Sequence, residues 1–192
     1  IALQPDLGTA TALGLIALVM LWVGGVRLQH LVGAGLVASL GIALSLATSR
    51  YQMQRLRSFV DPEGDPDGYY QVLQSLYGLG SGGFFGVGLG NSMQKEQYLP
   101  EPHTDFVFAF VGEEFGLVGT MVVLALFAAF AFYGLRIGRE SGDAHGYLVA
   151  TGITAMISIY ALLNIGVATG LLPTTGLPLP FVSYGGSSLM GN

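Results

Sequence analysis

The chain has 192 residues, of which 52% are hydrophobic and only 10% charged, and its formal net charge is −5. Soluble domains carry about 25% charged residues, so this composition, with a mean hydropathy of +0.61, indicates a protein that crosses a membrane several times. The sequence has no cysteine, which excludes disulfides, thiol nucleophiles and zinc–thiolate sites. It also has no basic run of the kind that binds nucleic acid.

Four stretches are long and apolar enough to cross a bilayer, since a helix needs about 20 apolar residues to span the hydrocarbon core. They cover approximately residues 7–26, 30–48, 115–135 and 146–171, and a fifth begins near Ser183. We therefore expect an all-α, polytopic transmembrane helix bundle, with four full spans plus the start of a fifth. Residues 1–192 are expected to form a single membrane domain. The chain does not begin with methionine and no positively charged segment precedes its first span, so we expect no signal peptide and interpret it as an internal fragment of a longer protein.

A long polar loop, residues 49–105, separates the second and third predicted spans. By parity, the turn that contains Arg27 and the connection 136–145 lie on the same side of the membrane. Their arginines favour the cytoplasm for that side. We therefore expect the long loop to be extracytoplasmic, and to have a function, because an irregular connection of this length is otherwise unusual.

The long loop is predicted to contain one helix and one irregular segment. Apolar residues recur at helical spacing after Asp67, which could cap the helix, and they predict an amphipathic or re-entrant helix: Tyr69, Val72, Leu73, Leu76 and Tyr77. Residues 78–90 contain seven glycines and are therefore poor helix formers. Non-helical backbone at membrane depth must be buried in protein or line a cavity, so we interpret this segment as a flexible, tightly packed loop on the substrate side.

Several short patterns do not indicate the sites that they superficially match. The glycines at 78, 80 and 83 match a dinucleotide fingerprint, but no strand precedes them. The acidic turn 61–67 lacks the glycine and glutamate of a calcium loop. Neither G-x-S-x-G nor H-E-x-x-H is present. Three G-x-x-x-G pairs, which start at Gly112, Gly134 and Gly166, predict helix-packing faces.

One carboxylate, Asp105, is predicted at the edge of the bilayer, where such a group is retained when it is paired or functional. If residues 105–114 form one helix, Glu113 and Glu114 lie about 12 Å further along the axis. That distance exceeds the roughly 5–9.5 Å of paired glycosidase acids, so Asp105 would act without a second acid from its own helix. We interpret the two glutamates as structural partners of basic groups.

Basic residues flank the long loop: Arg50, Arg55, Arg57 and Lys95. They either contact lipid headgroups by snorkelling or bind a pyrophosphate or another anionic headgroup. Both interpretations use the same attraction between cations and phosphate, and the residues alone leave both open.

Longer motifs follow one another along nearly the whole chain: QPDLGTA (4–10), RLRSFVDPEGDPDGYYQVLQSL (55–76), LGSGGFFGVGLGNSMQK (79–95), YLPEPHTDFVFAFVGEEFGLVG (98–119) and GLLPTTGLPLPFVSYGGSS (170–188). In this order they resemble the SEDS family of peptidoglycan polymerases (shape, elongation, division and sporulation), and most closely its division branch. The family has ten transmembrane helices, so the resemblance implies that this chain supplies the sixth helix to the start of the tenth. It also implies that the long loop is extracytoplasmic.

The resemblance implies a peptidoglycan glycosyltransferase of the bacterial plasma membrane, working at the division septum. Its substrate would be lipid II, a disaccharide-pentapeptide on undecaprenyl pyrophosphate, and its product β-1,4 glycan. The implied partners are a class B penicillin-binding transpeptidase and other division proteins. A lipid II flippase and a non-catalytic division scaffold are the alternatives.

The resemblance also implies that Asp105 is the catalytic aspartate. One base suffices for an inverting displacement, because pyrophosphate is already a good leaving group, and cations would stabilise it as it departs. Our candidates for substrate binding are the cations and three residues from the matched motifs: Lys95, Arg55, Arg57, Glu101, His103 and Ser81. We expect no organic cofactor and no protein metal site, and the residues leave a divalent-cation requirement open. The isolated fragment is expected to be inactive.

Overall fold

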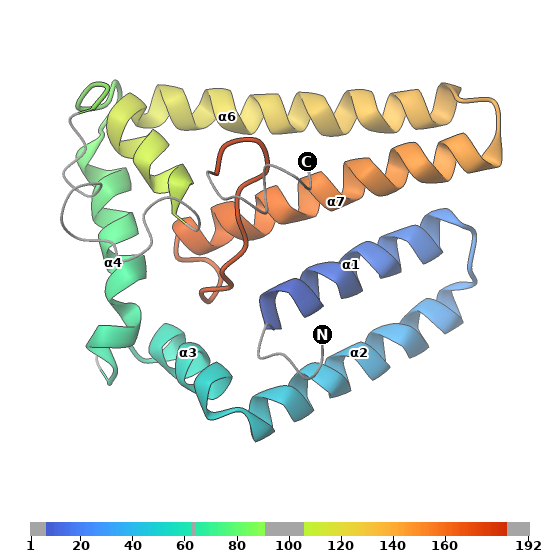
Figure 1. Ribbon diagram of the computed structural model, residues 1–192, viewed down its shortest axis with the longest axis horizontal. Coiled ribbons are helices and arrows are strands. Elements are labelled where there is room, and N and C mark those ends of the chain that lie inside the picture. Colours follow the sequence, from blue (N-terminus) through green and yellow to red (C-terminus); the bar gives the residue numbers. More distant parts are fainter. Residues whose placement is uncertain (1–6, 63, 91–105, 184–192) are drawn as a thin grey trace. The chain divides into compact units, whose positions relative to one another are not determined.

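The computed structural model describes residues 7–62, 64–90 and 106–183, and every regular element in these ranges is a helix (Figure 1). The helices are α1 (Leu7–Val23), α2 (Leu28–Thr48), α3 (Arg50–Val60), α4 (Pro66–Ser81), α6 (Val107–Glu140) and α7 (Ala144–Ala168). Of these, α2, α6 and α7 are long and apolar enough to cross a membrane, and α1 is a shorter apolar helix. The all-α prediction is confirmed for these ranges. Three of the four predicted full spans correspond to α2, α6 and α7, and the first corresponds to the shorter helix α1. The predicted start of a fifth span lies mostly outside the described residues.

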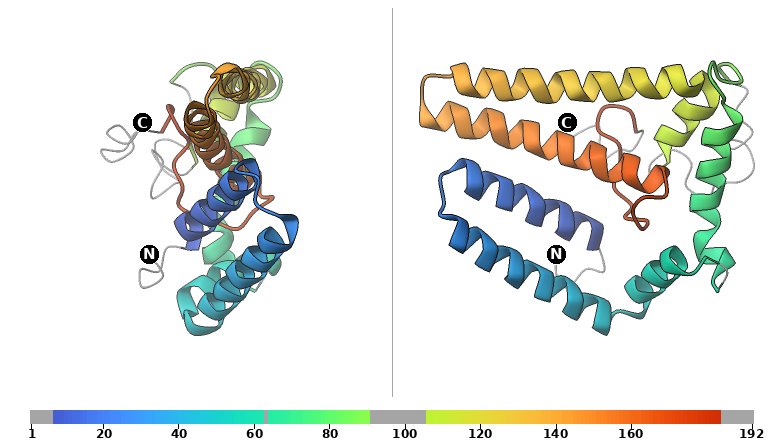
Figure 2. Two further views of the ribbon diagram at one scale, coloured as in Figure 1. Left: turned by 90° about the vertical axis from the view of Figure 1, so that its right-hand side faces the viewer. Right: turned by 180° about the vertical axis from the view of Figure 1, so that it is seen from behind.

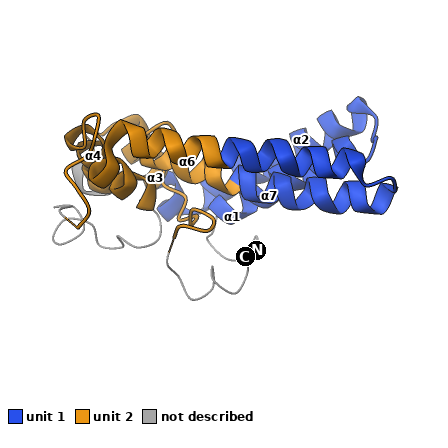
Figure 3. Ribbon diagram, turned by 90° about the horizontal axis from the view of Figure 1, so that it is seen from above, with its two compact units in different colours: residues 1–53, 127–159 blue, residues 54–126, 160–192 orange. Residues whose placement is uncertain are grey.

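The chain divides into two compact units (Figure 3), and α6 and α7 each contribute to both. Unit 1 contains residues 1–53 and 127–159, and unit 2 contains residues 54–126 and 160–192. Unit 1 therefore holds the α1–α2 hairpin, the C-terminal part of α6 from residue 127 and the N-terminal part of α7 up to residue 159. Unit 2 holds α4, the glycine-rich segment that follows it (residues 82–90) and most of the long loop.

In unit 1, α1 and α2 run antiparallel and are joined by a tight turn (Figure 2). The turn is a Schellman motif, in which Val26 N–H donates to the Leu21 carbonyl (3.1 Å) and Gly25 N–H to the Trp22 carbonyl (3.0 Å). Gly25 has a φ of +79°, which a glycine adopts without the penalty that a Cβ imposes. The glycine therefore sets where α1 ends.

The unit 1 halves of α6 and α7 pack through small residues. A Cβ at Gly134 would overlap the Thr154 hydroxyl, and a Cβ at Gly138 would lie 3.2 Å from Thr151 Oγ1. This contact confirms the packing role predicted for the Gly134 pair, because small residues let helix backbones approach closely in lipid. The α6–α7 connection is shorter than predicted, since α6 continues to Glu140. Asp143 Oδ2 then accepts the Gly146 N–H (2.9 Å) at the start of α7.

In unit 2, the end of α7 contacts α4 and is followed by a non-helical segment, residues 169–183. Ser75 of α4 is fully buried and its hydroxyl donates to the Ala168 carbonyl (2.7 Å), one of the carbonyls that a helix end leaves without an intrahelical partner. Asn164 Nδ2 donates to the Leu177 carbonyl (2.7 Å). Three prolines in this segment and Gly170, at a φ of +69°, explain why α7 does not continue.

Two of the predicted glycine pairs have roles other than packing two spans together. Gly170 forms a second Schellman motif, in which Leu171 N–H donates to the Gly166 carbonyl (2.8 Å), so the pair that starts at Gly166 terminates α7. A Cβ at Gly112 would overlap Leu79 of α4, while Gly116 interrupts α6. The G-x-x-x-G pattern alone did not distinguish these uses.

The long loop differs from the prediction in two ways. It contains an additional helix, α3, which sequence analysis missed because its three arginines mask the apolar positions. The predicted helix is confirmed as α4, but it starts at Pro66 and continues to Ser81, through two glycines. Asp65, whose carbonyl accepts the Tyr69 N–H (3.2 Å), therefore precedes the helix in place of Asp67, as expected when proline occupies the first helical position.

We predict opposite stability effects for two glycine-to-alanine substitutions in unit 1. Gly134→Ala should destabilise the protein by about 1–3 kcal/mol, since it overpacks the contact with Thr154. Gly35→Ala, where a Cβ has no neighbour within 4 Å, should stabilise α2 by up to about 1 kcal/mol through helix propensity. Thermal unfolding in detergent micelles, followed by circular dichroism, compares the two. Equal melting temperatures would contradict the packing described for α6 and α7.

Candidate functional site

α6 is broken at Gly116, and the segment between α4 and residue 91 supplies hydrogen-bond partners for the backbone groups that the break leaves unpaired within the helix. Gly116 has a φ of +65° and a ψ of −159°, so the helical bonds from the amides of residues 117 and 118 to the carbonyls of residues 113 and 114 are lost. The glycine-rich segment, residues 82–90, replaces all four partners. Val87 and Gly88 donate to the carbonyls of Glu113 (2.9 Å) and Glu114 (3.1 Å). In return, the amides of Leu117 and Val118 donate to the carbonyls of Gly83 (2.9 Å) and Phe84 (3.2 Å).

The close approach of these two backbones explains why the segment is rich in glycine. A Cβ at Gly82 would overlap the Gly112 carbonyl, a Cβ at Gly86 would overlap the Glu114 carbonyl, and a Cβ at Gly116 would overlap the Phe84 carbonyl. The predicted tight packing of the segment is therefore confirmed. The glycines meet protein backbone here, which gives them a structural role in place of a dinucleotide fingerprint.

The two glutamates of α6 lie in the short helical arm before the break, residues 107–115. Glu113 is buried, with 3% of its surface exposed. Glu114 Oε1 accepts the Gly90 N–H (3.2 Å), so at Glu114 the structure gives a backbone amide where we predicted a basic partner. A carboxylate that accepts a backbone N–H forms a charge-assisted hydrogen bond. Glu114 thereby ties the end of the glycine-rich segment to the α6 arm.

Four predicted site residues lie outside the described residues: Lys95, Glu101, His103 and Asp105. Their roles stay predictions. The described residues on either side of 91–105 are both attached to the α6 arm. On one side, the Gly90 N–H donates to Glu114 Oε1. On the other side, Phe106 is buried and its carbonyl accepts the Ala109 N–H (2.9 Å) at the start of the arm. α6 itself begins at Val107, so the helix spacing that we used for Asp105 is not tested.

The two arginines of α3 that we predicted to bind substrate, Arg55 and Arg57, lie in different environments. Arg55 is half-buried and one of its Nη1 hydrogens bonds the Thr174 carbonyl (3.1 Å), 119 residues further along the chain. Arg57 is exposed and lies about 160° from Arg55 around the helix, at 100° per residue. Arg55 therefore links α3 to the non-helical segment 169–183, while the guanidinium of Arg57 is open to a ligand.

Ser81, the last residue of α4, is exposed. Its hydroxyl donates to the Gly78 carbonyl of its own helix (2.9 Å), a contact within the last turn of α4. A role in substrate binding stays a prediction for this residue.

Sequence analysis also missed a polar contact between α3 and the start of α4. Asp65 Oδ2 accepts the hydroxyl hydrogen of the buried Ser58 (2.7 Å) and the Gln54 amide (3.2 Å). The signal available in the sequence was the Asp-Pro pair at 65–66, which is typical of a helix start. In the part of the chain that the structure describes, no group of three His, Asp or Glu side chains is arranged to hold a metal ion.

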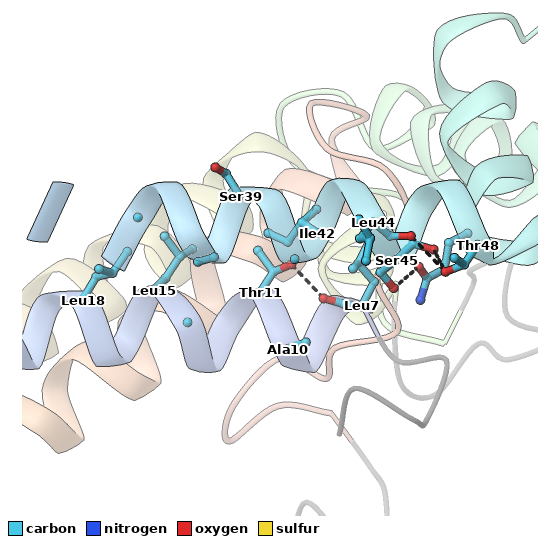
Figure 4. Close-up of a pocket in the computed structure, with 15 residues that line it drawn as sticks. Leu7, Ala10, Thr11, Leu15, Leu18, Ser39, Ile42, Leu44, Ser45 and Thr48 are labelled. Carbon is cyan, nitrogen blue, oxygen red and sulfur yellow. Dashed lines mark hydrogen bonds between the residues drawn. The ribbon is translucent and has the colours of Figure 1, made fainter. Parts of the chain in front are cut away.

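Unit 1 contains a separate cavity of about 580 Å³ between α1 and α2 (Figure 4). Its lining is mostly apolar, and its polar end is formed by Thr48, Ser45 and Gln52, where the Ser45 hydroxyl donates to Gln52 Oε1 (2.8 Å). None of its lining residues is titratable, so this cavity offers no acid or base for catalysis.

Comparison with known proteins identifies the family. The model of a family of cell cycle proteins, FtsW/RodA/SpoVE, matches residues 1–192. The chain belongs to the FtsW/RodA/SpoVE family. This confirms the resemblance that the sequence motifs indicated, and with the apolar helices it makes the chain a multi-pass membrane protein.

Relatives in the FtsW/RodA/SpoVE family match almost the entire chain. Stage V sporulation protein E of Bacillus subtilis is 48% identical over 187 residues, which are 97% of this chain and 51% of that protein. Two proteins named probable peptidoglycan glycosyltransferase FtsW are similarly close. The one from Marinobacter nauticus is 48% identical over 99% of this chain and 49% of its own length. The one from Trichlorobacter lovleyi is 44% identical over 97% and 49%.

A solved structure supports the same family fold. The solved structure describes structural coordination of polymerization and crosslinking by a peptidoglycan synthase complex. One of its chains is similar to the present chain, with a TM-score of 0.73 and 29% sequence identity. The match covers 98% of this chain and 52% of that one. The chain thus spans about half the length of the family members that it matches.

We predict that Gly116→Ala destabilises unit 2 far more than Gly80→Ala. The φ and ψ of Gly116 are essentially restricted to glycine, which costs other residues about 1–3 kcal/mol, and the added methyl group would also overlap the Phe84 carbonyl. Gly80 lies in α4 with no atom within 4 Å of a Cβ, so alanine there should be neutral or slightly stabilising.

Hydrogen exchange at the amides of Leu117 and Val118 provides the local measurement for this pair of variants. Both amides should lose protection in Gly116→Ala and keep it in Gly80→Ala. Unchanged protection in Gly116→Ala would show that the segment 82–90 does not depend on the break in α6.

Proposed function

We propose that the protein containing this chain is a membrane glycosyltransferase that polymerises lipid II into β-1,4 glycan strands. The observation that carries the proposal is the family match over all 192 residues, with several relatives that are named probable peptidoglycan glycosyltransferases. Because the chain spans about half of these relatives, the activity is proposed for the complete protein. The isolated chain is predicted to be inactive.

In the proposed reaction, Asp105 accepts the proton of the acceptor sugar hydroxyl as that oxygen attacks the anomeric carbon of the donor. The bond to pyrophosphate breaks in the same displacement, which converts the α-linkage of the donor into the β-linkage of the product. A single carboxylate is sufficient, since pyrophosphate leaves without the help of a general acid. No organic cofactor enters this step.

The described residues support the proposal by providing a fixed frame for the segment that contains Asp105. Glu114 bonds to Gly90 at one side of this segment, and the α6 arm begins directly after it at Val107. A catalytic group acts efficiently when its supporting elements are rigid. The four hydrogen bonds across the break in α6 supply that rigidity.

Among the predicted cations, we propose that Arg57 and Lys95 stabilise the departing pyrophosphate, as charged donors stabilise charge that develops in a transition state. The exposed guanidinium of Arg57 supports its assignment. Arg55 already donates to the Thr174 carbonyl, so we propose that its main role is to position α3. Glu101 and His103 remain proposed substrate contacts, and so does Ser81.

The proposed partners are a class B penicillin-binding transpeptidase and other division proteins, at the division septum of a bacterium. The solved relative that belongs to a peptidoglycan synthase complex supports an assembly of this kind. Identity is 48% both to the sporulation protein and to one FtsW, so the division role rests on the matched motifs.

We predict that Asp105→Asn abolishes polymerisation in the full-length protein. The substitution removes the base and barely changes the shape of the side chain, and general-base catalysis contributes about 10²–10⁴-fold to a rate. Purified protein in liposomes with lipid II, followed by gel analysis of the glycan, measures the rate, and Asp143→Asn in the α6–α7 connection is the matched control. Lost polymerisation with intact lipid II translocation supports the enzyme. Full polymerisation by the variant would exclude Asp105 as the base, and lost translocation would favour a flippase. If the unsubstituted protein neither polymerises nor translocates lipid II, a scaffold is favoured.

We further predict that Arg57→Ala and Arg55→Ala affect different properties. Arg57→Ala, like Lys95→Ala, should slow turnover and leave the melting temperature unchanged. Arg55→Ala should lower the melting temperature, since a hydrogen bond from a charged donor contributes about 1.5–3 kcal/mol. Turnover and thermal unfolding are measured on the same preparations. Unchanged turnover in Arg57→Ala or in Lys95→Ala would remove that residue from the site.

A further inference from the structure

The glycine-rich segment 82–90 exposes an apolar surface that the proposed reaction does not use. Phe84 and Phe85 are 71% and 86% exposed, which is unusual for such large apolar side chains. Two further apolar residues of the segment, Val87 and Leu89, are exposed as well, and so is Tyr77 near the end of α4. Contiguous apolar patches of this kind mark a surface that contacts a partner or a membrane.

This surface is continuous with the exposed apolar surface of α6. Because the amides of Leu117 and Val118 bond to the carbonyls of Gly83 and Phe84, the aromatic residues lie beside the first turn of α6 after its break. Large apolar side chains are exposed on α6 at and after this turn: Phe115, Leu117, Val118, Met121 and Val122. α6 is apolar enough to cross a membrane, so the patch adjoins the exposed apolar surface of a candidate membrane span.

The backbone around the patch also meets the requirement that lipid imposes. Close to a bilayer, non-helical backbone is stable only where its polar groups are paired within the protein. The segment pairs with the four groups released at the break in α6, and Gly86 N–H donates to the Gly82 carbonyl (2.7 Å). In addition, residues 68–94 contain no charged side chain, so insertion would carry no charge into the headgroup region.

We propose that the segment 82–90 docks onto the lipid bilayer beside α6, with Phe84 and Phe85 inserted at the boundary between headgroups and acyl chains. Aromatic and leucine side chains on an interfacial element bind at this depth. The inserted segment anchors the adjacent α6 arm at a constant height relative to the membrane surface. The proposal concerns the membrane and does not depend on the proposed glycosyltransferase activity.

Site-directed spin labelling of the full-length protein in phosphatidylcholine–phosphatidylglycerol vesicles tests this proposal. This chain has no cysteine, so only cysteines in the remaining portion need replacement before Phe84→Cys and Phe85→Cys are labelled singly. Both positions are exposed, so the label should not disturb packing. Val122→Cys, exposed on the apolar surface of the candidate span α6, is the bilayer control, and Ala144→Cys, exposed at the first residue of α7 next to the polar α6–α7 connection, is the aqueous control.

Collision of the label with oxygen, which concentrates in the bilayer, is compared with collision with a water-soluble nickel chelate. We expect the oxygen-to-nickel ratio at positions 84 and 85 to exceed that at 144 several-fold and not to exceed that at 122, which lies further along α6. A ratio equal to that at 144 would show that the segment lies in water. Protection from both reagents would show that polypeptide covers it. Either result would overturn the proposal.

Discussion

The exchange of four backbone hydrogen bonds between the break in α6 and the segment 82–90 is the interaction on which unit 2 depends. A break in a membrane helix releases amide and carbonyl groups that lipid cannot satisfy. Here the carbonyls of Glu113 and Glu114 and the amides of Leu117 and Val118 find partners about 30 residues earlier in the sequence. Neither element is stable in its observed form without the other. α6 would be left with unpaired groups, and the glycine-rich segment would lose the contacts that order it.

The thirty glycines of the chain do several different things, and only local geometry separates them. At Gly82, Gly86 and Gly116 a side chain would overlap the facing backbone. At Gly25 and Gly170 the positive φ ends a helix. A third group lets α6 and α7 approach each other, while other glycines face open space along the cavity in unit 1. A high glycine content in a membrane protein therefore indicates close packing only on average.

The features that could be predicted from the sequence are those that depend on short stretches of residues. The four apolar helices were predicted because hydropathy is a property of each stretch alone. α3 was missed because its arginines interrupt the apolar pattern. The break at Gly116 was missed since it lies at the start of the apolar stretch 115–135, where no proline or polar residue marks it. The cause of the break is a pairing with a distant segment.

The same limit applies to the candidate site. Arg55 was predicted to bind substrate, yet the structure gives it the Thr174 carbonyl as a partner 119 residues away, which no local pattern encodes. Ser81 and Glu114 likewise acquired backbone partners that the sequence did not show. The motif residues between 91 and 105 lie outside the described part of the chain, so their roles rest on the family to which the chain belongs.

The attachment of the residues that flank the segment 91–105 bears on the proposed catalysis. The described residues on both sides of 91–105 are held at the α6 arm: Glu114 accepts the Gly90 N–H, and Phe106, directly before the arm, is buried. Fixing both ends of a segment lowers the entropy cost of bringing its residues to one place. A reaction that requires an aspartate, an acceptor hydroxyl and a pyrophosphate in one geometry gains rate from such preorganisation. The break in α6 therefore contributes to the proposed preorganisation, because an unbroken helix would offer no free backbone groups to bind the segment that leads to Gly90.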